Sequence, residues 1–139
     1  MTLKQSSILL SRIALFVIYF WFGFLKIIGM SPASPMVQEL FGKTMGHIPF
    51  LSFGIFIILF GLFEMFVGML FLVPGAEKWA LILFFIHMIT VVLPLFIMPV
   101  WTHWFVPTLE GQYIIKNLAL VTCALNVWSI VPKESLEIV

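Results

Sequence analysis

The feature that most constrains this chain is the length of its apolar segments. Four of them, residues 7–28, 49–73, 78–98 and 111–131, match the roughly 20 apolar residues that a helix needs to cross a bilayer. Only 9% of the residues are charged and 63% are hydrophobic, whereas about 25% are charged in a typical soluble domain. So few polar side chains cannot cover a water-facing surface. The sequence therefore predicts an integral membrane protein whose solvent is the lipid bilayer.

The four segments are expected to be α-helices, because an open strand in lipid would leave backbone groups without hydrogen-bond partners. Their ends coincide with prolines, which cannot continue a helix: Pro32, Pro74, Pro99 and Pro132. Pro94 lies inside the third segment and predicts a kink there. The short connections make neighbouring helices antiparallel. The sequence thus predicts an all-α membrane protein, a four-transmembrane-helix antiparallel bundle, as a single domain over residues 1–139.

A short interfacial helix is expected between the first and second spans, in residues 36–44. Val37, Leu40 and Phe41 share one face there, because they are spaced i, i+3 and i+4. Pro49 suits the first turn of the second span.

The segment of residues 100–110 is expected to be a loop, with Trp101 and Trp104 at the level of the lipid head groups. His103 lies in this loop and His47 in the loop before the second span. Neither belongs to a closely spaced histidine pair of the kind that binds zinc. We therefore predict no metal site.

Charge and cysteine content exclude further classes. The net charge is +1 and no basic stripe is present, so we expect no nucleic-acid partner. Cys123 is the only cysteine, which rules out an intrachain disulfide and a multi-cysteine metal site. The apolar run of residues 8–30 is too long for a signal peptide.

The orientation follows from the basic residues. Four crossings put both termini on one side of the membrane. The terminal side carries Lys4, Arg12, Lys78 and Lys133, and the other side carries Lys26, Lys43 and Lys116. The positive-inside rule then predicts both termini in the cytoplasm, in a bacterial inner membrane.

Ionisable side chains within the spans are the main functional signal, because each costs roughly 2.5–3.5 kcal/mol at the bilayer centre on insertion scales. Glu64 and His87 each lie about nine residues from the turn between the second and third spans, about 13 Å from the terminal face. Arg12 starts nearer that face and has a long side chain. We expect Arg12, Glu64 and His87 to form an inner polar cluster. It is either a neutral clamp between helices or a proton-handling or ligand-anchoring site.

An outer polar cluster is expected near the opposite face. Lys26 ends the first span, and the fourth span begins with Glu110, Gln112, Lys116 and Asn117. Gln112 and Lys116 share a helix face. The two lysines could flank Glu110, bind an anion or hold the carbonyl of a quinone-like head group. The alternative is that they only extend toward the membrane surface.

Glycines at positions 54, 61 and 68 recur every seven residues along the second span. A seven-residue spacing keeps them close to one helix face, and small residues allow helices in membranes to approach closely. This stripe predicts tight packing against a neighbouring helix.

Several motifs, taken in order, resemble the DoxX-like family of small membrane proteins. Arg12 followed by residues 21–26, WFGFLK, is similar to the family's opening R…W-x-G-x-x-K. Residues 61–68, with Glu64 between two glycines, resemble its G-x-x-E-x-x-x-G, and His87 matches a third-helix histidine. Residues 110–118, EGQYIIKNL, resemble its E-G-x-[YF]-[IV]-x-K-N. The likeness runs from about Arg12 to Trp128.

The resemblance implies a four-helix membrane bundle, and one family branch is linked to thiosulfate:quinone oxidoreductases. We therefore expect a small subunit or accessory of a membrane redox process, with quinone as cofactor and a redox-complex subunit or a second copy as partner. The redox chemistry would belong to the quinone or the partner. Two alternatives stay open: a structural or assembly protein whose buried charges are interhelical clamps, and an oligomeric transporter of small solutes or ions. Whether the chain is itself an enzyme, and on which substrate, the residues do not decide.

Overall fold

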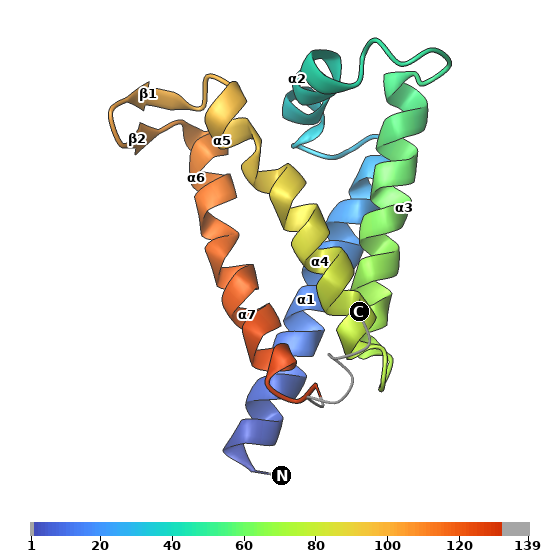
Figure 1. The fold of residues 1–139 in the computed structure, drawn as a ribbon, viewed down its shortest axis with the longest axis vertical. Helices are drawn as coiled ribbons and strands as arrows, with labels where there is room; N and C mark the ends of the chain where they lie inside the picture. The colour runs from blue at the N-terminus through green and yellow to red at the C-terminus, as the bar shows by residue number, and fades with distance from the viewer. Residues whose placement is uncertain (1, 132–139) are drawn as a thin grey trace.

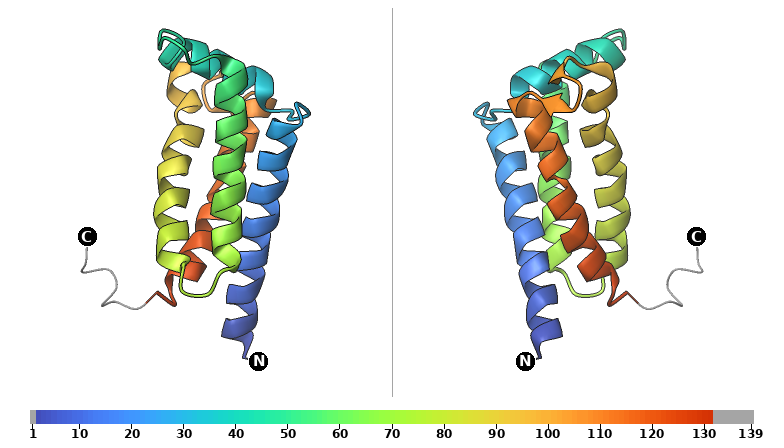
Figure 2. Two further views of the ribbon diagram at one scale, coloured as in Figure 1. Left: turned by 90° about the vertical axis from the view of Figure 1, so that its right-hand side faces the viewer. Right: turned by 90° about the vertical axis from the view of Figure 1, so that its left-hand side faces the viewer.

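The computed structural model describes residues 2–131, and this part of the chain is helical apart from one small hairpin (Figure 1). The elements are α1 (Leu3–Ile27), α2 (Ser34–Thr44), α3 (Phe53–Leu72), α4 (Glu77–Val92), α5 (Pro94–Ile97), β1 (Trp101–His103), β2 (Val106–Pro107), α6 (Leu109–Lys116) and α7 (Leu118–Trp128). The long helices run side by side, and α2 lies across one end of them (Figures 1 and 2). The expected helix between the first two spans is therefore present as α2.

Three helical stretches are long and apolar enough to cross a membrane: α1, α3, and α4 together with α5. Only 28% of the most apolar window of α1 is buried within the chain, and the other two windows are similar. The remaining apolar surface faces outward, where lipid can cover it. The chain is thus an integral membrane protein by the length and composition of its helices.

The start of α3 differs from the prediction. Pro49 was expected in the first helical turn, and this is wrong, because the helix begins at Phe53. Ser52 caps it, its hydroxyl accepting a hydrogen bond from the backbone N–H of Ile55 at 3.3 Å. A serine cap satisfies one of the free N–H groups of the first turn, which proline cannot do. Phe50 turns the chain just before the cap, with φ of 67°.

The kink at Pro94 is confirmed. The helix α4 ends at Val92 and α5 restarts at Pro94, because proline lacks the N–H that would continue the ladder. The segment at 111–131 is also interrupted, which was not predicted. There Asn117 separates α6 from α7, its N–H bonding Ile114 O in a tight turn. Pro132 and Lys133, which entered the boundary and orientation predictions, lie outside the described residues.

The segment of residues 100–110 is a hairpin rather than a plain loop. Its strands β1 and β2 pair antiparallel, with Trp101 opposite Pro107 and His103 opposite Val106. The indole N–H of Trp101 donates to Leu95 O at 2.9 Å, which ties the hairpin to α5.

The tightest helix packing joins α1 to α3, and glycines make it possible. A Cβ added to Gly61 would lie 2.6 Å from Gly23 O, and one added to Gly23 would lie 2.5 Å from Gly61 O. A Cβ added to Gly68 would lie 3.1 Å from the Cβ of Tyr19, which is also a close contact. The predicted stripe is therefore confirmed at Gly61 and Gly68. It is wrong at Gly54, where only Ser52 Oγ lies within 4 Å.

The helix α7 joins this pair through polar and apolar contacts. Asn126 donates to Ser7 Oγ at 2.9 Å and to Ser11 Oγ at 2.8 Å, both on α1. A buried core also brings together α1, α3, α4 and α7; its members are Leu15, Tyr19, Val67, Phe71, Ala80, Leu81, Phe84, Met88, Ala124 and Val127.

Candidate functional site

One face of α1 carries three polar residues at seven-residue intervals, Arg12, Tyr19 and Lys26. Seven residues make about two helical turns, so the three side chains lie in one row. This row lies against α3 and α4, and each member finds a partner there. The row thus brings the ionisable side chains of α1, α3 and α4 that lie between these helices into contact.

Lys26 and Glu64 form a buried ion pair between α1 and α3. The distance from Lys26 Nζ to Glu64 Oε2 is 2.6 Å, and the side chains are 6% and 8% exposed. Their charges cancel, which is the form in which ionisable groups are tolerated at membrane depth. The pair lies beside the Gly23–Gly61 contact, where the two helix backbones approach most closely.

His87 extends the pair into α4. Its Nε2 lies 3.1 Å from Glu64 Oε1, and its Nδ1 lies 2.9 Å from the hydroxyl of Tyr19. The first contact is close enough for electrostatic interaction but lacks the direction of a hydrogen bond, so Nε2 has no hydrogen-bond partner among the described residues. We call Tyr19, Lys26, Glu64 and His87 the buried polar network. The predicted proximity of Glu64 and His87 is thereby confirmed.

Aromatic rings enclose the buried polar network. The His87 ring lies 5.2 Å from the ring centres of Tyr19 and Phe60 and 5.9 Å from that of Phe63. Lys26 Nζ lies 5.5 Å above the Phe60 ring, a cation–π distance. The polar groups are buried among these rings, and electrostatic interactions in a buried site are stronger than at a surface.

Arg12 does not join this network, so its assignment to the inner cluster is wrong. Its Nε donates to Phe71 O at 2.6 Å and one terminal nitrogen donates to Glu77 Oε1 at 2.9 Å. Helical side chains lean toward the N-terminus of their helix. Arg12 therefore leans toward the terminal end of the bundle, where α3 ends and α4 begins, and away from Glu64.

The same direction of side chains explains why Lys26 lies in the buried polar network rather than in the predicted outer cluster. At the far end of α1, leaning toward the N-terminus carries the ammonium group inward to Glu64. The remaining members, Glu110, Gln112 and Lys116, are exposed on α6, and Asn117 is half-buried at the break. Lys116 lies 5.3 Å from the Tyr113 ring on its own helix. The outer cluster is thus not assembled as predicted.

Glu110 sits in the first turn of α6. Hydrogen bonds from its own backbone N–H and from the Thr108 hydroxyl lower the pKa of this exposed carboxyl below its ordinary value. The carboxylate is therefore charged at neutral pH. It suits the positive end of the helix rather than proton exchange near neutrality.

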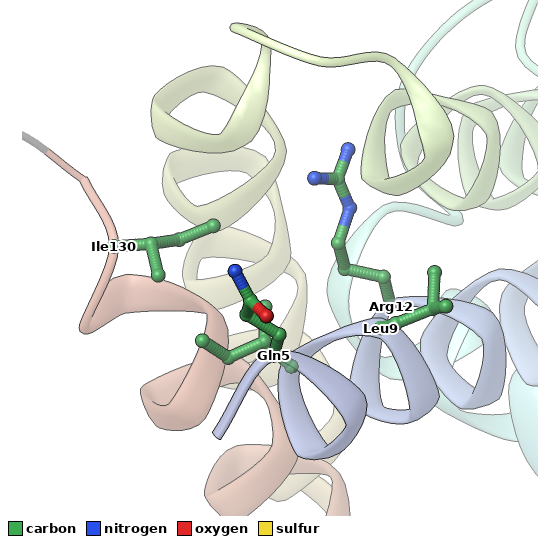
Figure 3. Close-up of a pocket in the computed structure, with 5 residues that line it drawn as sticks. Gln5, Leu9, Arg12 and Ile130 are labelled. Carbon is green, nitrogen blue, oxygen red and sulfur yellow. The ribbon is translucent and has the colours of Figure 1, made fainter. Parts of the chain in front are cut away.

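A shallow hollow of about 220 Å³ opens at the terminal end of the bundle. Figure 3 shows its lining side chains, with Gln5 and Ile130 on facing walls and the Arg12 guanidinium extending toward α3 and α4. Since Arg12 is already paired with Glu77, the hollow offers no unpaired charge to a ligand.

No group of three or more metal-ligating side chains occurs within residues 2–131. Comparison of the chain with protein-family models, curated proteins and solved structures gives no match. The site must therefore be interpreted from its own geometry.

Three contributors to these contacts were not predicted: Tyr19, Glu77 and Asn126. The signal for Tyr19 was available, because it lies seven residues from both Arg12 and Lys26. Glu77 is the acidic residue in the first turn of α4. From sequence alone, such a residue is expected only to interact with the helix dipole. Asn126 gave no local signal beyond being a polar residue in an apolar segment.

Proposed function

We propose that the chain is a DoxX-like four-helix membrane bundle in which α6 and α7 together make the fourth crossing. Residues 111–128 supply the length that a crossing requires. The break at Asn117 leaves both halves in one continuous path in Figure 1. In this arrangement both termini lie on the cytoplasmic side of a bacterial inner membrane, in accordance with the positive-inside rule.

We propose further that the chain is a small subunit or accessory of a membrane redox process. The observation that carries this is the buried polar network, four hydrogen-bonding side chains from three helices at membrane depth. Ionisable residues within spans commonly mark proton relays or ligand sites. Quinone reduction consumes protons, and the network can supply or accept one beside a quinone-like head group.

The network offers one route for proton movement, through the His87 ring. If the Tyr19 hydroxyl donates to His87 Nδ1, the hydrogen of the neutral imidazole lies on Nε2, toward Glu64. A proton accepted at Nδ1 can then be balanced by loss from Nε2 to the carboxylate once the two groups align, because their 3.1 Å contact lacks the direction of a hydrogen bond as it stands. The protein contributes binding and proton contacts, and the electron chemistry belongs to the quinone or to a partner subunit.

The experiment is purification of the native chain with its partners, followed by quinone extraction and redox difference spectra. Wild-type protein should carry quinone, and Glu64→Gln should lose most of it. Glu39→Gln is the matched control, because Glu39 forms an exposed pair with Lys43. Equal quinone content in both variants, or none in wild type, would contradict the proposal.

A second candidate function, the interhelical clamp, is favoured by the position of the Lys26–Glu64 pair beside the Gly23–Gly61 contact. In that case the charges fix the register of α1 on α3 and do no chemistry. Glu64→Gln would then lower thermal stability in detergent and leave quinone content and partner association unchanged.

A further inference from the structure

Two phenylalanines share an unusual conformation at one end of the bundle. Phe50 and Phe105 have positive φ values of 67° and 59°, and they are the non-glycine residues with positive φ in the described chain. The left-handed region is sterically unfavourable for a residue with a bulky side chain. In the turn at 75 and the bend at 29 the same conformation is taken by glycine.

Both phenylalanines are also exposed, 100% for Phe50 and 87% for Phe105. Each lies in the loop of a different connection, Phe50 between α2 and α3 and Phe105 between β1 and β2. Because α3 and α4 are antiparallel neighbours, the start of α3 and the end of α5 lie at the same end of the bundle. In Figure 1 the two connections project to opposite sides of that end.

The chain segments that carry these residues lack acidic residues, lysine and arginine. Residues 45–52 and 98–109 contain no Asp, Glu, Lys or Arg. Trp104, next to Phe105, is 90% exposed, and its indole N–H has no hydrogen-bond partner among the described residues, whereas Trp101 is bonded to Leu95 O. In water, such an aromatic tip is unfavourable for two reasons, because its backbone is in the left-handed region and its apolar ring is exposed to solvent. At the head-group level of a bilayer, the rings are solvated by lipid and the indole N–H meets lipid carbonyl groups.

We propose that Phe50 and the Trp104–Phe105 tip are two lateral anchors that insert into the same membrane interface on opposite sides of the bundle. Their partner is the lipid surface. Two anchors on opposite sides set both the depth and the tilt of this end of the protein. The hairpin therefore lies along the membrane rather than standing in water.

The test is the depth of spin labels in lipid vesicles of phosphatidylcholine and phosphatidylglycerol. Cys123→Ala removes the only cysteine, and Phe50→Cys, Phe105→Cys or Glu39→Cys then supplies one labelling site. Glu39 is the matched control, since it lies on α2 at the same end and is paired with Lys43 at the surface. Oxygen should relax the labels at 50 and 105 more than a water-soluble nickel complex does, and the order should reverse at 39.

Labels at 50 and 105 that behave like the label at 39 would overturn the proposal. Dipolar broadening that vanishes on dilution with unlabelled protein would also overturn it, since it would identify a second copy of the chain as the partner. Trp104→Phe provides a test without a label. Quenching of tryptophan fluorescence by interfacially brominated lipid should fall in this variant, and unchanged quenching would contradict insertion.

Discussion

The buried ionisable residues of the helices are stabilised by pairing with one another rather than by contact with water. The Lys26–Glu64 contact at 2.6 Å shows the principle, because neither charge would be tolerated alone at that depth. Removing one partner leaves an uncompensated buried charge, whereas removing both leaves apolar surface.

We therefore predict a non-additive pair of variants. Lys26→Met alone should destabilise the fold by about 3–5 kcal/mol, and Glu64→Met should do so in the same direction, because breaking a buried pair leaves one charge alone. The double variant Lys26→Met, Glu64→Met should recover most of that loss. Thermal unfolding in detergent, followed by circular dichroism, measures all three.

The exposed Glu39–Lys43 pair is the control for this prediction. Its side chains are 47% and 42% exposed, so Glu39→Gln should change stability by no more than about 0.5 kcal/mol. A double variant as unstable as the sum of the single variants would show that the two side chains do not act as a pair.

His87 permits a prediction about hydrogen position. The Tyr19 hydroxyl lies 2.9 Å from Nδ1, and if it donates to this nitrogen, as the proposed proton path requires, the neutral ring carries its hydrogen on Nε2. Nitrogen NMR of the imidazole should show this tautomer in wild type. Tyr19→Phe should mix the two tautomers and lower stability by about 1–3 kcal/mol, because Nδ1 then lacks its partner. A wild-type ring with hydrogen on Nδ1 would contradict the proposed proton path.

At the scale of elements, the contact of α1 with α3 determines where the ionisable groups meet. It depends on Gly23 and Gly61 having no side chains. The α1 row of Arg12, Tyr19 and Lys26 can only reach α3 and α4 because the helix axes come this close.

Gly61→Ala tests this packing. The new Cβ would lie 2.6 Å from Gly23 O, so overpacking should cost about 1–3 kcal/mol and weaken the neighbouring ion pair. Gly42→Ala is the matched control on α2, where nothing lies within 4 Å of the added carbon. It should be neutral or stabilise by up to about 1 kcal/mol, since alanine favours helix over glycine. Thermal unfolding of both variants decides, and equal effects would show that the contact is not close.

At the scale of the whole molecule, the path of α6 and α7 determines how many times the chain crosses the membrane. We predict that a fluorescent protein fused after Val139 is bright and that alkaline phosphatase at the same point is inactive, because the proposed four crossings and the positive-inside rule would place this end in the cytoplasm. Phosphatase inserted at Thr102 in the hairpin should be active. The same phosphatase activity at Thr102 and after Val139 would mean that α6 and α7 do not cross the membrane.

The sequence predicted more of the fold than of the site. Three of the predicted spans, the helix at α2 and the kink at Pro94 follow from local composition and proline chemistry, which neighbouring residues largely decide. The start of α3 and the break at Asn117 were missed, because Ser52 capping and a tight turn compete with an uninterrupted apolar pattern.

Sequence alone determined the solvent of this protein and the meeting of Glu64 with His87. The apolar composition requires lipid as the solvent. A short turn joins two antiparallel helices, so residues equally far from the turn along the chain lie at the same depth. Only the tertiary structure decided that Lys26, and not Arg12, completes the network. That choice depends on how the helices rotate about their axes and how closely α1 approaches α3 at its glycines. The position of a residue along its helix, which is what the sequence provides, determines neither of these.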